Sequence, residues 1–212
     1  MKNFFYFLFF IHFLFSMDEK KERKDVIIYI KKYALFAVEE MEKFGIPASI
    51  KLGQGILESS MGNSILAKDA NNHFGIKCGR NWKGNIYYHD DDLPRECFRK
   101  YNSVRESFND HSKFLKNPRY SELFDLEKND YKAWAIGLKK AGYATSLNYS
   151  ERLIHQIEKY FLWKLDKENS REIEKKIDQY LIEIKKDKTE HIGSFFWIHF
   201  LDKIFLFFKK KN

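Results

Sequence analysis

The sequence predicts a mostly helical α+β fold in which a small β-lobe lies beside a helical body. Apolar residues recur three or four positions apart in several segments between residues 25 and 162, as they do in amphipathic helices. Residues 82–101 instead place short runs rich in Tyr, Ile and Phe between turn signals, as in a hairpin. The chain has 212 residues, of which 44% are hydrophobic, and this suits one domain with appendages.

The sequence predicts two consecutive helices near the start of the domain, and the second contains a glutamate near its end. Apolar side chains follow a helical spacing over residues 25–44, and Gly45 stops the pattern. Pro47 opens the next helical run, residues 48–60, which contains Glu58 near its end. Helical periodicity returns later in the chain, over residues 107–115, 131–140 and 150–162, with Ser150 as the candidate N-cap of the last run.

The first 16 residues have the profile of a secretory signal peptide. One Lys precedes an almost unbroken apolar run from Phe4 to Phe15, and a charged stretch follows Ser16. As a helix, the apolar run from Phe4 to Phe15 rises about 18 Å, which is less than the roughly 30 Å thickness of the hydrocarbon core of a membrane. A full membrane span is therefore disfavoured. Leu14 occupies a position where cleavage needs a small residue, so retention of the segment as an N-terminal anchor is the alternative. In both cases we expect an exported protein, periplasmic or associated with the cell envelope.

The C-terminal part of the chain divides into a charged helix and an apolar tail. Residues 164–191 are rich in charge and carry apolar residues at helical spacing, which predicts a solvated amphipathic helix or linker. These apolar residues are Ile173, Ile177, Leu181 and Ile184. Residues 192–212 form an apolar tail with a basic end, interrupted by Asp202 and Lys203. Because such residues cost roughly 2.5 to 3.5 kcal/mol each at a bilayer centre, we expect contact with a membrane surface, or packing on the protein, before spanning.

The composition excludes several classes of protein. Lys and Arg exceed Asp and Glu by 38 to 30, but the lysines cluster in the tails rather than along a groove, so we expect no nucleic-acid partner. Three Pro and ten Gly exclude a collagen-like chain, and two Cys exclude a zinc ribbon. The histidines show no metal-ligand spacing, and we expect no metal and no cofactor.

The two cysteines, Cys78 and Cys97, flank the predicted lobe. In an exported protein, an even pair that bounds one subdomain suggests a disulfide. Closing a loop of about 20 residues contributes roughly 3 kcal/mol in the chain-entropy description. We therefore expect these two residues to be bonded to each other.

Glu58 is a candidate general acid on the character of its neighbours. It lies at a helix end beside the apolar residues Ile56, Leu57 and Met61. Desolvation disfavours the charged form of a carboxyl and raises its pKa, which a general acid that works near neutral pH needs. The alternative is a solvated glutamate on the surface.

Five sequence blocks occur in an order typical of one enzyme family. They are QGILESSMGNS at residues 54–64, NNHFGIK at 71–77, NWKG at 81–84, FRKYNSVRESFNDHSKFL at 98–115 and AGYATSLNY at 141–149. With these blocks the chain resembles the bacterial endo-β-N-acetylglucosaminidases, which are the glucosaminidase domains of cell-wall autolysins and of the flagellar rod-cap hydrolase. The resemblance implies a glucosaminidase domain over residues 25–163, with a lysozyme-like fold and a groove for a glycan strand.

The resemblance also implies a reaction and a set of site residues. Members of the family cleave the peptidoglycan bond after N-acetylglucosamine, and Glu58 is expected to protonate the leaving glycosidic oxygen. Tyr143 corresponds to a tyrosine that relatives keep beside the sugar. The residues expected to bind substrate or shape the groove are Asn72, Phe74, Trp82 and Tyr149, with core packing as the alternative for Phe74.

The second catalytic group has more than one candidate. Glycosidases usually pair the acid with a base or nucleophile, about 5 to 5.5 Å away when retaining and about 6.5 to 9.5 Å away when inverting. Relatives place theirs in the β-lobe, where the candidates in this chain are Asp90, Asp91, Asp92 and Glu96. We favour the run of three aspartates by position. The alternative is a substrate-assisted reaction, in which the acetamido carbonyl of the substrate attacks and the Tyr143 phenol supports it.

Two other classes of protein are alternatives to a glucosaminidase. A muramidase or lytic transglycosylase of lysozyme-like fold can also use a single glutamate, and its products end in N-acetylmuramic acid or the 1,6-anhydro form. A catalytically weak, wall-binding scaffold is the second. In each case the expected partner is the peptidoglycan glycan strand, and we expect a monomer.

Overall fold

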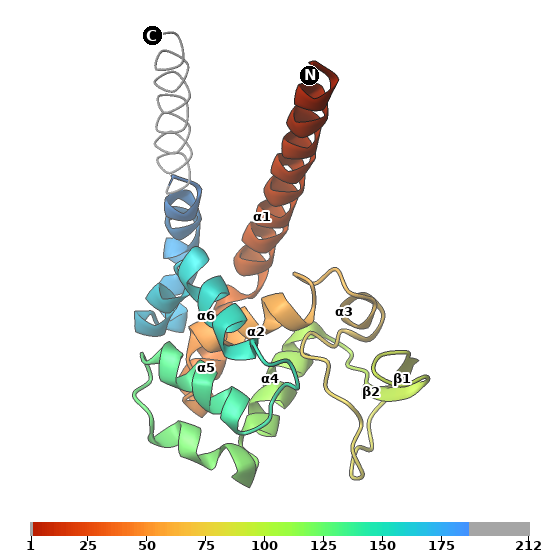
Figure 1. Ribbon diagram of the computed structural model, residues 1–212. Helices are drawn as coiled ribbons and strands as arrows, with labels where there is room; N and C mark the ends of the chain where they lie inside the picture. The colour runs from red at the N-terminus through yellow and green to blue at the C-terminus, as the bar shows by residue number, and fades with distance from the viewer. Residues whose placement is uncertain (1, 187–212) are drawn as a thin grey trace. The chain divides into compact units, whose positions relative to one another are not determined.

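The structure is a computed structural model that describes residues 2–186, with side chains from residue 19 onward. The chain divides into two compact units, residues 1–174 and 175–212. The first unit consists of helices and one two-stranded sheet, which confirms the predicted α+β class (Figure 1). Within residues 2–186, no helix has the length and apolar character needed to cross a membrane. The predicted apolar tail, residues 192–212, lies outside the described residues.

The first helix, α1, spans Lys2–Phe44, so it begins well before the predicted start at Asp25. The stretch that leads to Asp25 consists mainly of Glu, Lys and Arg, which are strong helix formers, so nothing interrupts the helix. The backbone therefore has no break at residue 16, where the predicted signal peptide or anchor ends. The helix ends as predicted at Gly45, whose φ is +76° and whose N–H donates to the Met41 carbonyl at 2.9 Å.

The helix α2 (Ala48–Glu58) is central to the helical body. It contacts several other elements, namely α1, α5 (Tyr131–Lys140), α6 (Tyr149–Lys159) and the 3₁₀ helix η2 (Leu162–Lys167) (Figure 1). Every residue from Ala48 to Ile56 is buried. Gly53 lets α6 approach closely, because a Cβ there would lie 2.7 Å from Leu153 Cδ1. The end of α2 that carries Glu58 is therefore held in place by packing on several sides.

The N-terminus of α2 is capped by a residue from a distant part of the chain. Pro47 supplies no side-chain cap, but the Asp166 carboxylate accepts from the Ser49 backbone N–H at 2.8 Å and from its hydroxyl at 2.6 Å. A carboxylate at a helix N-terminus satisfies free N–H groups and interacts favourably with the helix dipole. Asp166 thus anchors the end of α2 opposite Glu58.

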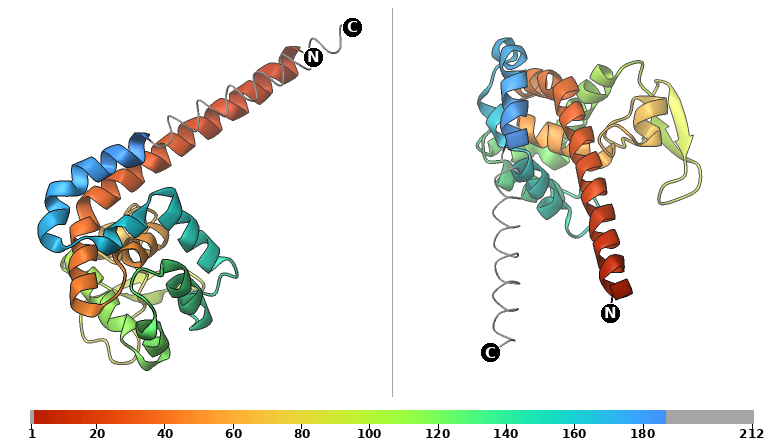
Figure 2. Two further views of the ribbon diagram at one scale, coloured as in Figure 1. Left: turned by 90° about the vertical axis from the view of Figure 1, so that its left-hand side faces the viewer. Right: turned by 90° about the horizontal axis from the view of Figure 1, so that it is seen from above.

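The β-lobe is a short antiparallel hairpin at one side of the helical body, as predicted for residues 82–101 (Figures 1 and 2). Its strands are β1 (Ile86–His89) and β2 (Glu96–Arg99). A disulfide joins Cys78 to Cys97, with the two Cα atoms 5.5 Å apart. The segment before the hairpin runs along β2, where the Cys78 N–H donates to the Cys97 carbonyl at 2.9 Å. The disulfide therefore ties that segment to β2.

Two short helices were not predicted. The helix α3 (Ile65–Ala70) has Ser64 as its N-cap, and the 3₁₀ helix η1 (Pro118–Asp125) has a Pro in its first turn. Both lack the several turns of amphipathic periodicity that identify a helix in a sequence. The lobe is linked to α3 through Tyr87 of β1, whose hydroxyl donates to the Asp69 carboxylate at 3.0 Å.

The remaining predicted helices are present, with shifted ends. The helix α4 (Val104–Leu115) begins before residue 107, because Ser103 caps it by accepting from the Glu106 N–H at 3.2 Å. The helix α5 matches the predicted residues 131–140. The N-cap of α6 is Asn148, so the prediction of Ser150 was wrong, and the helix ends before Phe161, whose φ of 52° is left-handed. The charged helix predicted within residues 164–191 occupies residues 170–186.

Candidate active site

Glu58 is the last residue of α2, and the chain leaves the helix through a tight turn. Ser60, Met61 and Gly62 all have left-handed φ values, of 49°, 59° and 79°. Non-glycine residues rarely adopt this conformation, which costs about 1–3 kcal/mol each and is concentrated at functional sites. The buried Ser59 closes the turn, because its hydroxyl donates to the Gly55 carbonyl and accepts from the Gly62 N–H at 2.7 Å. The turn leaves the Glu58 side chain half-buried.

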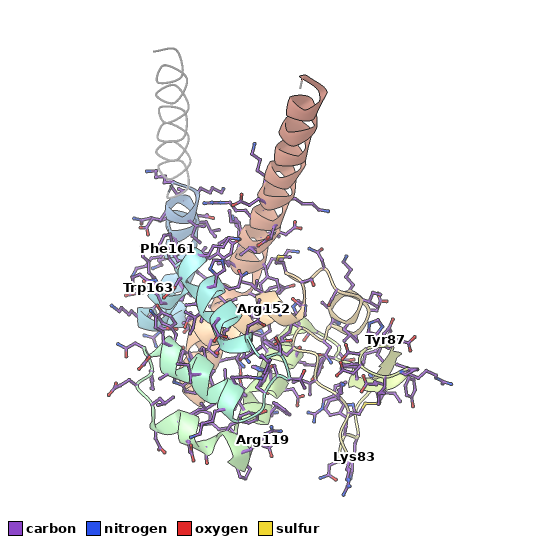
Figure 3. The ribbon with its side chains drawn as sticks, viewed as in Figure 1. Lys83, Tyr87, Arg119, Arg152, Phe161 and Trp163 are labelled. Atoms are coloured by element: carbon purple, nitrogen blue, oxygen red, sulfur yellow. A yellow bond between two sulfur atoms is a disulfide. The ribbon has the colours of Figure 1, made fainter. Side chains whose placement is uncertain are left out.

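The surroundings of Glu58 favour its neutral form. Burial raises the pKa of Glu58 to about 7, and the negative charge of Asp91 adds to this effect. A hydrogen bond with Tyr149 and the positive charge of Arg152, which extends from α6 in Figure 3, act in the opposite direction. A helix C-terminus carries partial negative charge and also disfavours a carboxylate. Near pH 7, Glu58 therefore holds a proton in a large fraction of molecules, as a general acid must.

Tyr149 is the direct partner of Glu58. Its hydroxyl accepts from Gln54 Nε2 at 2.9 Å, and this leaves its own hydrogen to donate to the Glu58 carboxyl. Gln54 and Glu58 are four residues apart on α2 and so lie on the same face of the helix. The sequence pointed to Tyr149 as a substrate contact, which stays a prediction; the structure shows its hydrogen bond to Glu58.

Tyr143 lies in the same cluster of side chains. Its ring centroid is 5.6 Å from that of Tyr149, and its hydroxyl is 3.0 Å from His111 Nε2. Burial raises the pKa of Tyr143 well above its usual value, and the nearby charges of Tyr149 and Glu58 act in the same direction. Tyr143 is therefore a neutral phenol close to Glu58, as its expected place beside the sugar requires.

The four lobe carboxylates have different surroundings. The Glu96 carboxylate accepts from Lys77 Nζ at 2.7 Å and from the Leu93 N–H at 3.3 Å, and the Asp90 carboxylate accepts from the Arg95 N–H at 2.7 Å. The hydrogen bond from Lys77 lowers the pKa of Glu96. Both residues therefore hold the turn of the hairpin together.

Asp91 and Asp92 are the freer pair of lobe carboxylates. They lie 3.6 and 3.8 Å from Lys77 Nζ, and their side chains are 53% and 77% exposed. Of the four candidates, Asp91 is the one whose charge contributes to the raised pKa of Glu58. The structure thus brings one member of the predicted aspartate run into electrostatic reach of the acid.

Asn72 and Phe74 are parts of the protein interior. Asn72 is 1% exposed, and its amide group bonds to backbone groups of its own loop and to the Arg99 carbonyl. Phe74 stacks on His111, with ring centroids 3.9 Å apart and an interplanar angle of 6°. The amide of Asn72 has no group left for a glycan, so the prediction that it binds substrate gives way to a role in loop structure. For Phe74 the packing alternative describes what the structure shows.

Trp82 lies away from the cluster around Glu58. Its indole N–H donates to the Asn85 carbonyl at 2.9 Å, and the Arg99 guanidinium lies 4.7 Å above its ring. It lines a cavity of about 770 Å³ between the lobe, α1 and α4, and neither Glu58 nor Tyr143 lines this cavity. The prediction that Trp82 contacts the substrate has no support from these neighbours.

Two site residues were missed by the sequence reasoning. Lys51 is fully buried on α2, and His111, fully buried on α4, links it to Tyr143. The available signal for Lys51 was its helical spacing from Glu58, which puts the two residues on the same face of α2, two turns apart. Within residues 2–186, no group of three His, Cys, Asp or Glu side chains is arranged to hold a metal ion.

Comparisons with known proteins identify the family of this chain. Residues 34–162 match the sequence profile of the Glucosaminidase family, described as mannosyl-glycoprotein endo-β-N-acetylglucosaminidase. The chain is 33% identical over 165 residues to the exo-glucosaminidase LytG of Bacillus subtilis, covering 71% of this chain and 57% of LytG. It is 29% identical over 138 residues to the peptidoglycan hydrolase FlgJ of Vibrio parahaemolyticus, and the match covers 59% of this chain and 44% of FlgJ. The chain thus spans about half the length of these curated relatives.

A solved structure supports the same relationship. The crystal structure of a peptidoglycan hydrolase from Sphingomonas sp. A1 is similar, with a TM-score of 0.56 and 27% sequence identity, over 74% of this chain and 94% of that one. The family profile covers more than half of the present chain and includes Glu58, Tyr143 and Tyr149. The chain therefore belongs to the glucosaminidase family of glycoside hydrolases.

Proposed function

We propose that this protein hydrolyses the glycan strands of peptidoglycan at the bond that follows N-acetylglucosamine, with Glu58 as the general acid. The observation that carries the proposal is the Glu58 carboxyl itself, whose pKa burial raises to about 7 and which forms a hydrogen bond with Tyr149. Proton donation by a positioned side chain typically contributes 10²- to 10⁴-fold in rate. The half-buried position of Glu58 is consistent with access by a substrate.

Asp91 is the second carboxylate in this proposal. Its charge acts on Glu58, and Lys77 Nζ lies 3.6 Å from its carboxylate. The two-carboxylate scheme uses a second carboxylate near the acid. Asp90 and Glu96 are less suited, because backbone N–H groups of the hairpin turn occupy their oxygens. The acetamido-assisted alternative relies instead on Tyr143, which lies near Glu58.

The site of action follows from the substrate. Peptidoglycan lies outside the cytoplasmic membrane, and the N-terminal segment has the profile of an export signal. We therefore expect the protein in the periplasm or cell envelope. Action as a monomer and contact of the C-terminal tail with a membrane surface stay predictions.

The identity of the released products tests the function. Purified sacculi are digested with the protein, the products are reduced with borohydride, and mass spectrometry identifies the sugar at the reducing end. Reduced N-acetylglucosamine is the expected result. Reduced N-acetylmuramic acid would identify a muramidase, 1,6-anhydro ends would identify a lytic transglycosylase, and binding without release would identify a scaffold.

The same digestion decides between internal and terminal cleavage, because one relative is named an exo-glucosaminidase while the family description is endo. Internal cleavage shortens long strands early in the reaction. Terminal cleavage releases small fragments while the strands stay long. Glu58→Gln serves as the inactive control, and Glu127→Gln, which changes an exposed glutamate of the connection before α5, serves as the matched active control.

A further inference from the structure

A continuous line of hydrogen bonds connects the interior of the helical body to the site. Lys51 Nζ lies 2.8 Å from His111 Nδ1, and His111 Nε2 lies 3.0 Å from the Tyr143 hydroxyl. Lys51 and His111 are both 0% exposed, whereas Tyr143 is half-buried beside Tyr149 and Glu58. Burying a lysine costs free energy of folding, which favours a role of Lys51 other than packing.

The acceptors around Lys51 fix the direction of these hydrogen bonds. Besides His111 Nδ1, its ammonium group reaches the Phe108 carbonyl at 3.2 Å and the Ser112 hydroxyl at 2.6 Å. An ammonium group has three donors and no acceptor, so three partners match it. Nδ1 of His111 must therefore accept, and in the neutral imidazole the hydrogen then sits on Nε2.

This tautomer determines what the Tyr143 hydroxyl can do. A protonated Nε2 donates to the hydroxyl oxygen, so the hydroxyl hydrogen is not used by His111. The opposite tautomer would draw that hydrogen toward Nε2, away from Glu58 and Tyr149. Phe74 stacks on the imidazole and so restrains a ring flip, which would put ring carbons in the places of the two nitrogens.

We propose that Lys51 is a positioning residue for the glycan reaction: by donating to His111 Nδ1 it holds His111 as the Nε2–H tautomer, and this leaves the Tyr143 hydroxyl free to donate toward a sugar bound at Glu58. The inference rests on the proposed function only for the identity of the sugar. The tautomer itself is a property of the free protein and is measured without substrate.

Nitrogen-15 NMR of the full-length protein, labelled at histidine, reads the tautomer directly. The measurement is made at pH 6, because burial lowers the pKa of Lys51 to about 7 and that of His111 well below its usual value, so the ammonium group and the neutral imidazole coexist there. The His111 signal is identified by its loss in His111→Gln. We expect Nε2 to be protonated and Nδ1 unprotonated, and the reverse result overturns the proposal.

A second set of variants tests the effect on catalysis. Lys51→Met shortens the unbranched side chain by one atom and removes its donors, and we expect kcat to fall about tenfold with KM nearly unchanged, as for one lost hydrogen bond. In a Tyr143→Phe background the same change should have little further effect, because the hydroxyl that it orients is absent. Full additivity of the two losses overturns the proposal.

His111 offers a matched pair that does not depend on the folding of the lysine variant. The amide nitrogen of Gln reaches the place of Nε2 and can donate to Tyr143, whereas the shorter Asn reaches only the place of Nδ1. We expect His111→Gln to keep several-fold more activity than His111→Asn at equal thermal stability. Equal losses in the two variants indicate packing alone and overturn the proposal.

These outcomes separate the inference from the proposed function. If digestion gives no N-acetylglucosamine ends but the Nε2–H tautomer is found, then the function is wrong and the arrangement of Lys51 and His111 stands. If the ends are found but the tautomer is reversed, then the function stands and the positioning role is wrong.

Discussion

The helical body and the β-lobe differ in the solvent exposure of their ionisable groups. In the body, Lys51 and His111 are fully buried and hydrogen-bonded to each other, and burial dominates the pKa of Glu58. In the lobe, Asp91 and Asp92 are largely exposed and share one lysine. Burial changes protonation strongly, whereas exposed charges are screened by solvent. The body therefore sets the protonation state at the site, and the lobe contributes a charge that water and salt attenuate.

The scaffolds of the two regions differ as well. The helix α2 is surrounded by other helices and capped by Asp166 at its far end. The lobe has one two-stranded sheet, which is marginal on its own, and depends on the disulfide and on contacts such as that of Tyr87 with Asp69. Changes in the body should act mainly on chemistry, and changes in the lobe on both chemistry and local stability.

The largest effect is expected for the acid in the body. Glu58→Gln is nearly isosteric but cannot donate a carboxyl proton, so we expect turnover of peptidoglycan to fall by about 10² to 10⁴. The initial rate of release of reducing ends measures it, with Glu127→Gln as the control. Binding to sacculi and the thermal midpoint should stay close to those of the parent. Activity of Glu58→Gln within threefold of the parent contradicts the assignment.

The disulfide in the lobe comes next. Replacing both Cys78 and Cys97 by Ser removes a closed loop of about 20 residues, which is expected to lower stability by roughly 3 kcal/mol in the chain-entropy description. Hydrogen exchange should show the loss at the amides of β1 and β2, with those of α2 affected less. In the parent, alkylation without reductant should find no free thiol. Equal protection of the lobe in the variant and the parent contradicts the structural role of the bond.

The lobe carboxylates test whether the second group comes from the protein. We expect Asp91→Asn to lower kcat by about a hundredfold, as the loss of a general base does, while Asp92→Asn changes it little. Asp92 is the matched control, because it is adjacent, exposed and paired with the same lysine. Should all four lobe amides stay active while Tyr143→Phe loses more than any of them, the acetamido-assisted mechanism replaces Asp91. If Glu96→Gln alone is inactive and folded, the choice of the aspartate run is wrong.

The smallest effect concerns pH and compares charges from the two regions. Since the acid must be protonated, kcat/KM should fall about tenfold per pH unit above a pKa of about 7 for Glu58. Arg152, in the body, lowers this pKa, so Arg152→Gln should move the fall to higher pH. Asp91, in the lobe, raises it, so the residual rate of Asp91→Asn should fall at lower pH. Shifts in the same direction for both variants contradict the electrostatic assignment.

The sequence by itself determined the elements that depend on neighbouring residues. The predicted residues of α5 match, α2 begins at Ala48 as predicted and ends two residues before the predicted Ser60, and the hairpin lies within residues 82–101. Helical periodicity, a glycine at a helix end and turn residues act over a few positions, so a single sequence displays them. The glucosaminidase family was likewise evident from short motifs. The place of Glu58 in one of these motifs made it the candidate acid, which stays a prediction.

Only the tertiary structure decided which side chains meet at the site. Gln54 bonds to Tyr149 across 95 positions, Lys51 to His111 across 60, and Ser49 to Asp166 across 117. It also directed Asn72 and Trp82 into contacts within the protein, and it placed Asp91 where its charge raises the pKa of Glu58. Such contacts depend on how helices pack and on where water is excluded, and neither is recorded in the spacing of residues along the chain. The pKa of Glu58, which burial raises to about 7, is one consequence of this packing.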